Sequence, residues 1–225
     1  MLVREFCAEN MELVPAAVAA GAARVELCDN LAVGGTTPSY GVIRAAVAHA
    51  RETGTDVMCM VRPRGGSFEY TPAEAQMMRD DLVMAKSLGV TGVVFGCLRD
   101  GRLDKELTSE LVRLAHEDTP EAPGRVAVTF HMAFDALAPE DQLPAIDWLA
   151  DQGVERILTH GGAAGTPIAG NLGRLRAYIE RAAGRIVILP GGGITWENAE
   201  DVAAELGVSE VHGTKIVRIG EKDVR

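Results

Sequence analysis

The residues best suited to chemistry in this sequence are two carboxylate–thiol pairs, Glu5 with Cys7 and Glu26 with Cys28. Each pair ends a short apolar run, and its two members are two positions apart. If the runs are β-strands, alternate side chains share a face, so each carboxylate projects beside its thiol. Two thiolates from adjacent strands would suit a soft ion such as Cu(I), because polarizable sulfur prefers soft metals. The alternative is that both cysteines are small buried hydrophobes.

A second group of residues is suited to binding an anion. Arg62 and Arg64 precede two glycines, and two guanidinium groups beside a flexible backbone can clamp a phosphate or a carboxylate. The alternative for an inward-pointing arginine is a structural ion pair with Glu5 or Glu26. Both interpretations stay open, and they do not exclude each other.

Histidines end two later apolar runs. His131 is followed four residues on by Asp135, and this pair could act as a general base or supply a metal ligand. The alternative is a hydrogen-bonded structural histidine. His212 ends the last apolar run and is a candidate third ligand beside the two thiols.

The elements that must position these residues follow from periodicity. Short apolar runs rich in β-branched residues predict eight strands: Leu2–Cys7, Arg24–Cys28, Asp56–Arg62, Val90–Gly96, Arg125–His131, Val154–Thr159, Arg185–Pro190 and Val208–Gly213. Helical periodicity predicts helices over Met11–Ala20, Pro38–Arg51, Pro72–Leu88, Asp104–His116, Pro139–Gln152 and Trp196–Leu206. This alternation implies βαβ units and a parallel sheet, and eight such units predict a TIM (β/α)₈ barrel. The competing fold is a doubly wound open sheet, but no G-x-G-x-x-G turn follows the first strand.

A barrel would gather the candidate residues, because barrel chemistry occurs at the C-terminal ends of the strands. Gly191, Gly192 and Gly193 follow the seventh strand, where barrels commonly bind phosphate through backbone N–H groups. The dozen residues after Gly213 show no helical pattern. Either the eighth helix is missing or the C-terminus departs from the barrel plan. We expect residues 1–225 to form a single domain.

Composition narrows the partners and the location. The formal net charge of −10 argues against nucleic acid or an anionic membrane as the main partner, although a few local arginines could still hold a small anion. No secretory signal and no apolar run of transmembrane length are visible, which predicts a cytoplasmic protein. Thiols stay reduced there, and the four cysteines form no C-x-x-C pair.

Five motifs, in order along the chain, carry a resemblance to a known family. They are Glu26-Leu27-Cys28 with Gly34-Gly35-Thr36-Thr37-Pro38-Ser39-x-Gly41, Arg62-Pro63-Arg64-Gly65-Gly66-x-Phe68-x-Tyr70, Thr129-Phe130-His131-x-Ala133-Phe134-Asp135, Arg156-Ile157-Leu158-Thr159 and Pro190-Gly191-Gly192-Gly193-Ile194. The sequence resembles the CutC copper-homeostasis family, and the resemblance runs from Glu5 to His212. It implies a cytoplasmic TIM barrel with Cu(I) ligands at Cys7 and Cys28.

The sequence also departs from that family's usual pattern. Members generally have Asp where Ser67 stands, Arg where Met132 stands and Ser where His160 stands. Their eighth strand continues from its histidine into a serine-containing segment, whereas Gly213 and Thr214 follow here. These changes alter the charge balance of the barrel mouth, and His160 adds a metal or anion contact.

Three functions compete at this point. The first is a copper protein that holds Cu(I) through Cys7 and Cys28, with His131 or His212 as a third partner. The second is a lyase, isomerase or hydrolase acting on a small phosphorylated or carboxylated substrate, with anion contacts from the Arg62–Arg64 clamp and the glycine turn. Its acid–base groups would be Glu5, Glu26, His131 and Asp135. The third is a non-catalytic scaffold, which nothing in the sequence favours. We also expect a homo-oligomer formed through barrel helices.

Overall fold

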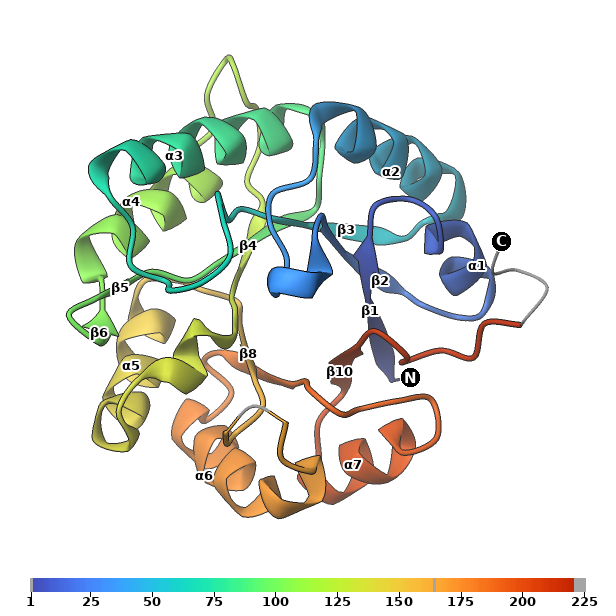
Figure 1. The fold of residues 1–225 in the computed structure, drawn as a ribbon, viewed down its shortest axis with the longest axis vertical. Helices are drawn as coiled ribbons and strands as arrows, with labels where there is room; N and C mark the ends of the chain where they lie inside the picture. Colours follow the sequence, from blue (N-terminus) through green and yellow to red (C-terminus); the bar gives the residue numbers. More distant parts are fainter. Residues whose placement is uncertain (1, 164, 221–225) are drawn as a thin grey trace.

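Eight parallel strands roll into a barrel in the computed structural model, which describes residues 2–163 and 165–220 (Figure 1). The barrel strands are β1 (Val3–Glu9), β2 (Arg24–Cys28), β3 (Asp56–Met60), β4 (Gly92–Phe95), β7 (Ala127–Phe130), β8 (Arg156–Thr159), β9 (Val187–Pro190) and β10 (Glu210–Gly213). All eight coincide with predicted strands, each observed strand differing from its predicted range by no more than two residues at either end. The predicted TIM barrel is confirmed.

Hydrogen-bonded ladders join neighbouring strands in the order β10-β1-β2-β3-β4-β7-β8-β9. Within the described ranges no ladder joins β9 to β10, although the two strands lie in contact along this seam. The first and last strands are therefore close, since β10 pairs with β1 from Val3 to Phe6. This pairing places the first and the last strand of the barrel side by side.

Helices surround the barrel on its outside (Figure 1). They are α1 (Val14–Ala19), α2 (Tyr40–Thr53), α3 (Pro72–Ser87), α4 (Lys105–His116), α5 (Pro139–Asp151), α6 (Leu172–Ala182) and α7 (Ala199–Leu206), with short 3₁₀ turns η1 (Leu31–Val33), η2 (Met132–Ala136) and η3 (Ile168–Gly170). The sequence predictions omitted α6 and the small hairpin of β5 (Leu98–Arg99) and β6 (Arg102–Leu103). No α-helix follows β10 in residues 214–220, as the sequence suggested. None of the described helices combines the length and apolar character needed to cross a membrane.

Side chains alternate between two cores along the strands. Phe6, Val25 and Leu27 belong to the large apolar core between barrel and helices. Cys7 and Cys28 belong to a separate small cluster, because alternate positions of a barrel strand face the interior. The alternation explains how the carboxylate–thiol pairs come to lie inside the barrel rather than under its helices.

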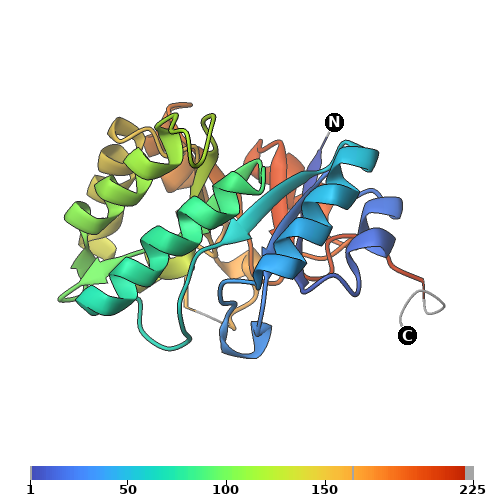
Figure 2. The same ribbon diagram turned by 90° about the horizontal axis from the view of Figure 1, so that it is seen from above.

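The loops after β2 and β3 lie together on one face of the barrel (Figure 2). The helix after the second of these loops begins with a capping box, in which Thr71 and Glu74 exchange hydrogen bonds with each other's backbone N–H groups. Because the capping box sets where α3 begins, it also sets the position at which the long loop from Arg62 to Tyr70 ends. This loop forms part of the barrel mouth.

Candidate functional site

The first two strands bring the two carboxylate–thiol pairs together. In the parallel ladder, Cys7 lies opposite Glu26 rather than opposite Cys28. Both thiols reach one oxygen: the Sγ atom of Cys7 lies 3.6 Å from Glu26 Oε1, and that of Cys28 lies 3.3 Å from it. All three side chains are buried. The Glu26 carboxyl group thus contacts two sulfur atoms at once.

His212, in β10, adds an imidazole to this group. Its Nδ1 atom lies 2.8 Å from Glu5 Oε1 and 3.9 Å from Glu26 Oε2. Ligand atoms of Cys7, Glu26 and His212 lie within 4.8 Å of one another, close enough to share one metal ion. We call Cys7, Glu26, Cys28 and His212 the thiol cluster. Of the candidate metal ligands that the sequence indicated, it contains Cys7, Cys28 and His212, but neither His131 nor His160.

Two thioethers adjoin the thiol cluster. Met58 and Met60, which share a face of β3, pack with Cys7 and Cys28 in the small inner core. These two methionines were not among the candidate ligands that the sequence indicated. Their spacing of two residues, in phase with Arg62 just beyond the end of β3, is the signal that could have placed them inside the barrel. This small inner core therefore contains four sulfur side chains.

A buried ion-pair network lies nearer the start of the strands. Arg24 donates hydrogen bonds to Glu5 and, over 2.6 Å, to Glu210. Arg156 donates to the same Glu210 oxygen over 2.9 Å. Burial by itself raises the pKa of Glu5, but the His212 hydrogen bond and the Arg24 charge outweigh burial and lower this pKa to about 2. Glu5 is consequently an ionised link between the network and the thiol cluster.

The protonation states of the thiol cluster follow from its contacts. A hydrogen bond with Cys28 lowers the pKa of Cys7, which reaches about 5 despite burial because His212 also contributes. The same hydrogen bond, with burial, raises the pKa of Cys28 well above its ordinary value. Burial and the neighbouring Cys7 charge raise the pKa of Glu26 to about 8. At neutral pH Cys7 is a thiolate, while Cys28 and Glu26 keep their protons.

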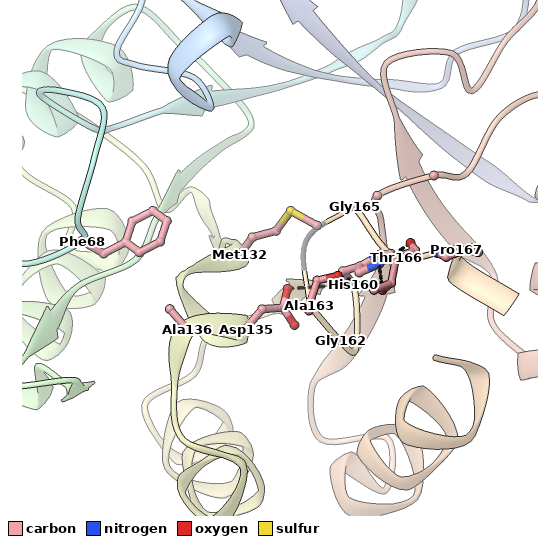
Figure 3. Close-up of a pocket in the computed structure, with 12 residues that line it drawn as sticks. Phe68, Met132, Asp135, Ala136, His160, Gly162, Ala163, Gly165, Thr166 and Pro167 are labelled. Carbon is pink, nitrogen blue, oxygen red and sulfur yellow. Dashed lines mark hydrogen bonds between the residues drawn. The ribbon is translucent and has the colours of Figure 1, made fainter. Parts of the chain in front are cut away.

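Two adjoining cavities open at the barrel mouth. The inner cavity, of about 170 Å³, is lined by the thiol-cluster residues Cys7, Glu26 and His212 and by Met60, Phe68, His131 and Met132. The outer pocket, of about 720 Å³, is lined by loops that follow β3, β7, β8 and β9, with Phe68, Met132, Asp135 and His160 among its walls (Figure 3). Phe68 and Met132 line both cavities. Of the predicted glycine turn, Gly192 and Gly193 line the outer pocket.

The two predicted anion-binding arginines are held by the protein's own acceptors. Arg62 donates to the backbone carbonyls of Val33, Gly35 and Gly66, and its Cζ atom lies 4.9 Å from the centre of the Phe68 ring. It pairs with neither Glu5 nor Glu26. Arg64 pairs with Glu74 and donates to three further backbone carbonyls of its own loop, those of Gly65, Ser67 and Glu69. Both side chains thus hold loops of the mouth in place.

His131 and Asp135 do not contact each other. His131 accepts a hydrogen bond from Ala133 N–H at Nδ1 over 3.1 Å, and its ring fits there because a Cβ atom at Gly96 would lie 2.5 Å from that nitrogen. Asp135 accepts hydrogen bonds from Thr159 Oγ1 and from the backbone N–H groups of His160 and Gly161. The pair predicted from the spacing of four residues is therefore divided between two hydrogen-bond systems.

Comparison with known proteins agrees with this geometry. A sequence model of the CutC family matches residues 2–217. The chain belongs to the CutC family. A CutC family protein of Enterococcus faecalis is 54% identical over 217 residues, which cover 96% of this chain and 100% of that protein. The human copper homeostasis protein cutC homolog is 39% identical over 213 residues, which cover 92% of this chain and 71% of that protein.

Solved structures extend the comparison to the fold. The crystal structure of CutC from Streptococcus agalactiae superposes with a TM-score of 0.90 at 42% identity, covering 96% of this chain and 100% of that one. A deoxyribose phosphate aldolase from Aeropyrum pernix gives a TM-score of 0.69 at 13% identity, covering 96% of this chain and 86% of that one. The second likeness shows the barrel fold alone.

Two positions at which we expect a departure from the CutC family's usual pattern lie in the wall of the outer pocket. Met132 lines both cavities, and His160 lines the outer one. Both ring nitrogens of His160 already lie near backbone oxygens, Nδ1 at 3.1 Å from Gly191 O and Nε2 at 2.9 Å from Thr166 O. His160 in this member of the CutC family therefore joins two loops of the mouth.

We expect iodoacetamide to alkylate Cys7 first when the protein is treated at pH 6. Cys7 is a thiolate that lines the inner cavity, whereas Cys28, Cys59 and Cys97 are completely buried and have raised pKa values. Mass spectrometry of peptides from timed, quenched samples gives the rate at each cysteine. Equal rates at Cys7 and Cys28 would contradict the assigned protonation states.

Proposed function

We propose that this CutC family member is a cytoplasmic copper-handling protein that binds Cu(I) between Cys7 and Cys28 at the barrel mouth. One observation carries the proposal: both thiol sulfurs converge on the same carboxyl oxygen, Glu26 Oε1. Sulfur atoms that share one contact can also share one ion. The copper homeostasis name of the human relative is consistent with this role.

The chemistry of the donors fits a soft cation. Cys7 already carries the thiolate form that binds metals, and binding at Cys28 would displace one further proton. Met60 lines the same cavity with a thioether, a ligand that favours Cu(I) over hard cations. His212 is the candidate third ligand, and its hydrogen bond to Glu5 fixes the orientation of its ring. Glu26 keeps its proton below about pH 8 and is thus a poor competitor for the ion.

The test is a titration of the reduced, metal-free protein with Cu(I) against a competing chelator. The wild type should bind one equivalent tightly, and the Cys7→Ser/Cys28→Ser variant should lose this site. A Cys59→Ala/Cys97→Ala variant removes two other buried cysteines that lie in the outer apolar core, so it should keep the site. Loss of the tight Cu(I) site in both variants would indicate a general effect of cysteine removal and would contradict the proposed ligands.

Circular dichroism and thermal unfolding of the same variants separate binding from packing. The serine variant should keep the wild-type spectrum and melt close to the wild type. A large loss of thermal stability would show that the two thiols serve the core instead. Weak Cu(I) binding, or equal binding by wild type and serine variant, would contradict the copper role.

A further inference from the structure

The buried imidazole of His131 has a donor that no described residue uses. Because Ala133 N–H donates to Nδ1, the lone pair lies on Nδ1 and the proton of the neutral ring is assigned to Nε2. The Nε2 atom is buried and has no hydrogen-bond partner within the described ranges. His131 is 4% exposed and lines the inner cavity. An unused buried N–H group is destabilising, and an acceptor oxygen of a ligand would remove that cost.

The surroundings of this donor favour a negatively charged acceptor. Phe68 packs on the His131 ring, with 5.0 Å between ring centres, and also on the Arg62 guanidinium. Arg62 is buried, and its hydrogen-bond acceptors are neutral backbone carbonyls. No ion pair joins Arg62 to a carboxylate in the described part of the chain.

The outer pocket offers apolar contact for the rest of such a ligand. Its walls include Phe68, Met132 and Pro167, and its polar side chains are engaged elsewhere. The Asp135 carboxylate accepts three hydrogen bonds, and both nitrogens of His160 lie within hydrogen-bond distance of backbone oxygens. At about 720 Å³ the pocket has the size of a small-molecule site. Phe68 and Met132 make it continuous with the inner cavity, where the unused donor lies.

We propose that the barrel mouth binds a small organic monocarboxylate with an aliphatic or aromatic body. The carboxylate accepts the hydrogen bond from His131 Nε2–H, with the Arg62 charge nearby, and the body of the acid occupies the outer pocket against Phe68 and Met132. This site adjoins the thiol cluster, which lines the same inner cavity, but it uses none of the cluster's side chains. The inference goes beyond copper binding and does not require it.

The experiment is an NMR titration of copper-free protein labelled with ¹⁵N-histidine. Butanoate, hexanoate and 3-phenylpropanoate serve as probes, with 3-phenylpropanamide as the uncharged match and inorganic phosphate as the anion without a body. At least one acid should bind saturably and move the His131 Nε2–H proton resonance. The amide and phosphate should bind at least about tenfold more weakly, because each lacks one of the two recognised parts. Saturation by none of the acids, or equal binding of acid and amide, would overturn the proposal.

Substitutions of His131 test whether its Nε2–H group is the hydrogen-bond donor to the carboxylate. The His131→Phe variant keeps the ring and removes the N–H group, so its dissociation constant for the acid should rise at least about tenfold. The His131→Gln variant restores an amide N–H and should recover part of that loss. An unchanged dissociation constant in the His131→Phe variant would refute the role of His131. If the His131→Phe variant does not fold, the shift of the His131 Nε2–H resonance of the wild type during the titration decides whether His131 is the donor. The Cys7→Ser/Cys28→Ser variant keeps His131 and removes a negative charge from the inner cavity, so it should bind the acid at least as tightly as the wild type, which separates failure here from failure of the copper site.

Discussion

Replacing Glu5 by glutamine should lower the free energy of unfolding by about 3 kcal/mol, because it leaves buried positive charge without its partner. The Arg24 and Glu5 side chains are 4% and 1% exposed, so solvent cannot take over the lost interaction. Arg24 would retain only the Glu210 carboxylate as a charged partner, and the single amide oxygen could accept a hydrogen bond from only one of Arg24 and the His212 ring. Glutamine has nearly the same shape as glutamate, so the loss reports charge rather than a cavity. Urea denaturation at pH 7 measures it.

The matched control is Glu117→Gln. Glu117 forms an exposed pair with Arg113 one helical turn away, with side chains 44% and 56% exposed. Pairs of this kind contribute little in water, so the urea midpoint should stay at the wild-type value. Equal midpoints for the Glu5→Gln and Glu117→Gln variants would contradict the idea that the interior network holds β1, β2 and β10 together.

His131 should make the protein sensitive to mild acid. Burial, with the Arg62 charge, lowers the pKa of this histidine from 6.5 to about 3 in the folded protein. The unfolded chain therefore binds a proton more readily than the folded one between these values. The stabilisation is complete above pH 6.5 and is lost as the pH falls towards 3. Between pH 7 and pH 5, His131 alone should cost about 2 kcal/mol of stability.

Urea denaturation of the wild type and of the His131→Phe variant at pH 7 and pH 5 measures this effect. The variant has no group to protonate at this position, so it should lose about 2 kcal/mol less than the wild type over the same interval. A Phe68→Leu variant keeps the imidazole and should lose as much as the wild type. Parallel losses in wild type and the His131→Phe variant would mean that the ring is free to protonate when folded.

The sequence was sufficient to predict the barrel and the meeting of its first strands. Glu5 and Cys7, like Glu26 and Cys28, are two residues apart in apolar runs, and strand alternation alone puts each pair on one face. Parallel neighbours then place the pairs side by side. His212 could be added because a closed barrel brings its last strand beside its first, where β10 pairs with β1.

The roles of Arg62 and Arg64 could not be predicted in the same way. Their acceptors are mostly backbone carbonyls, which every residue has, so no residue type in the sequence marks them. The unused Nε2–H of His131 was equally hidden, because it depends on which nitrogen accepts the Ala133 N–H. The spacing of Met58 and Met60 is consistent with one strand face. Methionine is common in apolar cores, however, so this spacing alone does not predict thioethers beside the two thiols.

The register between β1 and β2 affects the redox behaviour of the two thiols. Cys7 pairs with Glu26, so Cys28 lies two residues further along its strand. With strands ~4.8 Å apart and a rise of ~3.3 Å per residue, the Cα atoms of the two cysteines lie about 8 Å apart. A disulfide needs Cα atoms less than about 7 Å apart, so oxidation would have to displace one strand along the other. The diagonal offset brings both sulfur atoms to one carboxyl oxygen while disfavouring a disulfide bond between them.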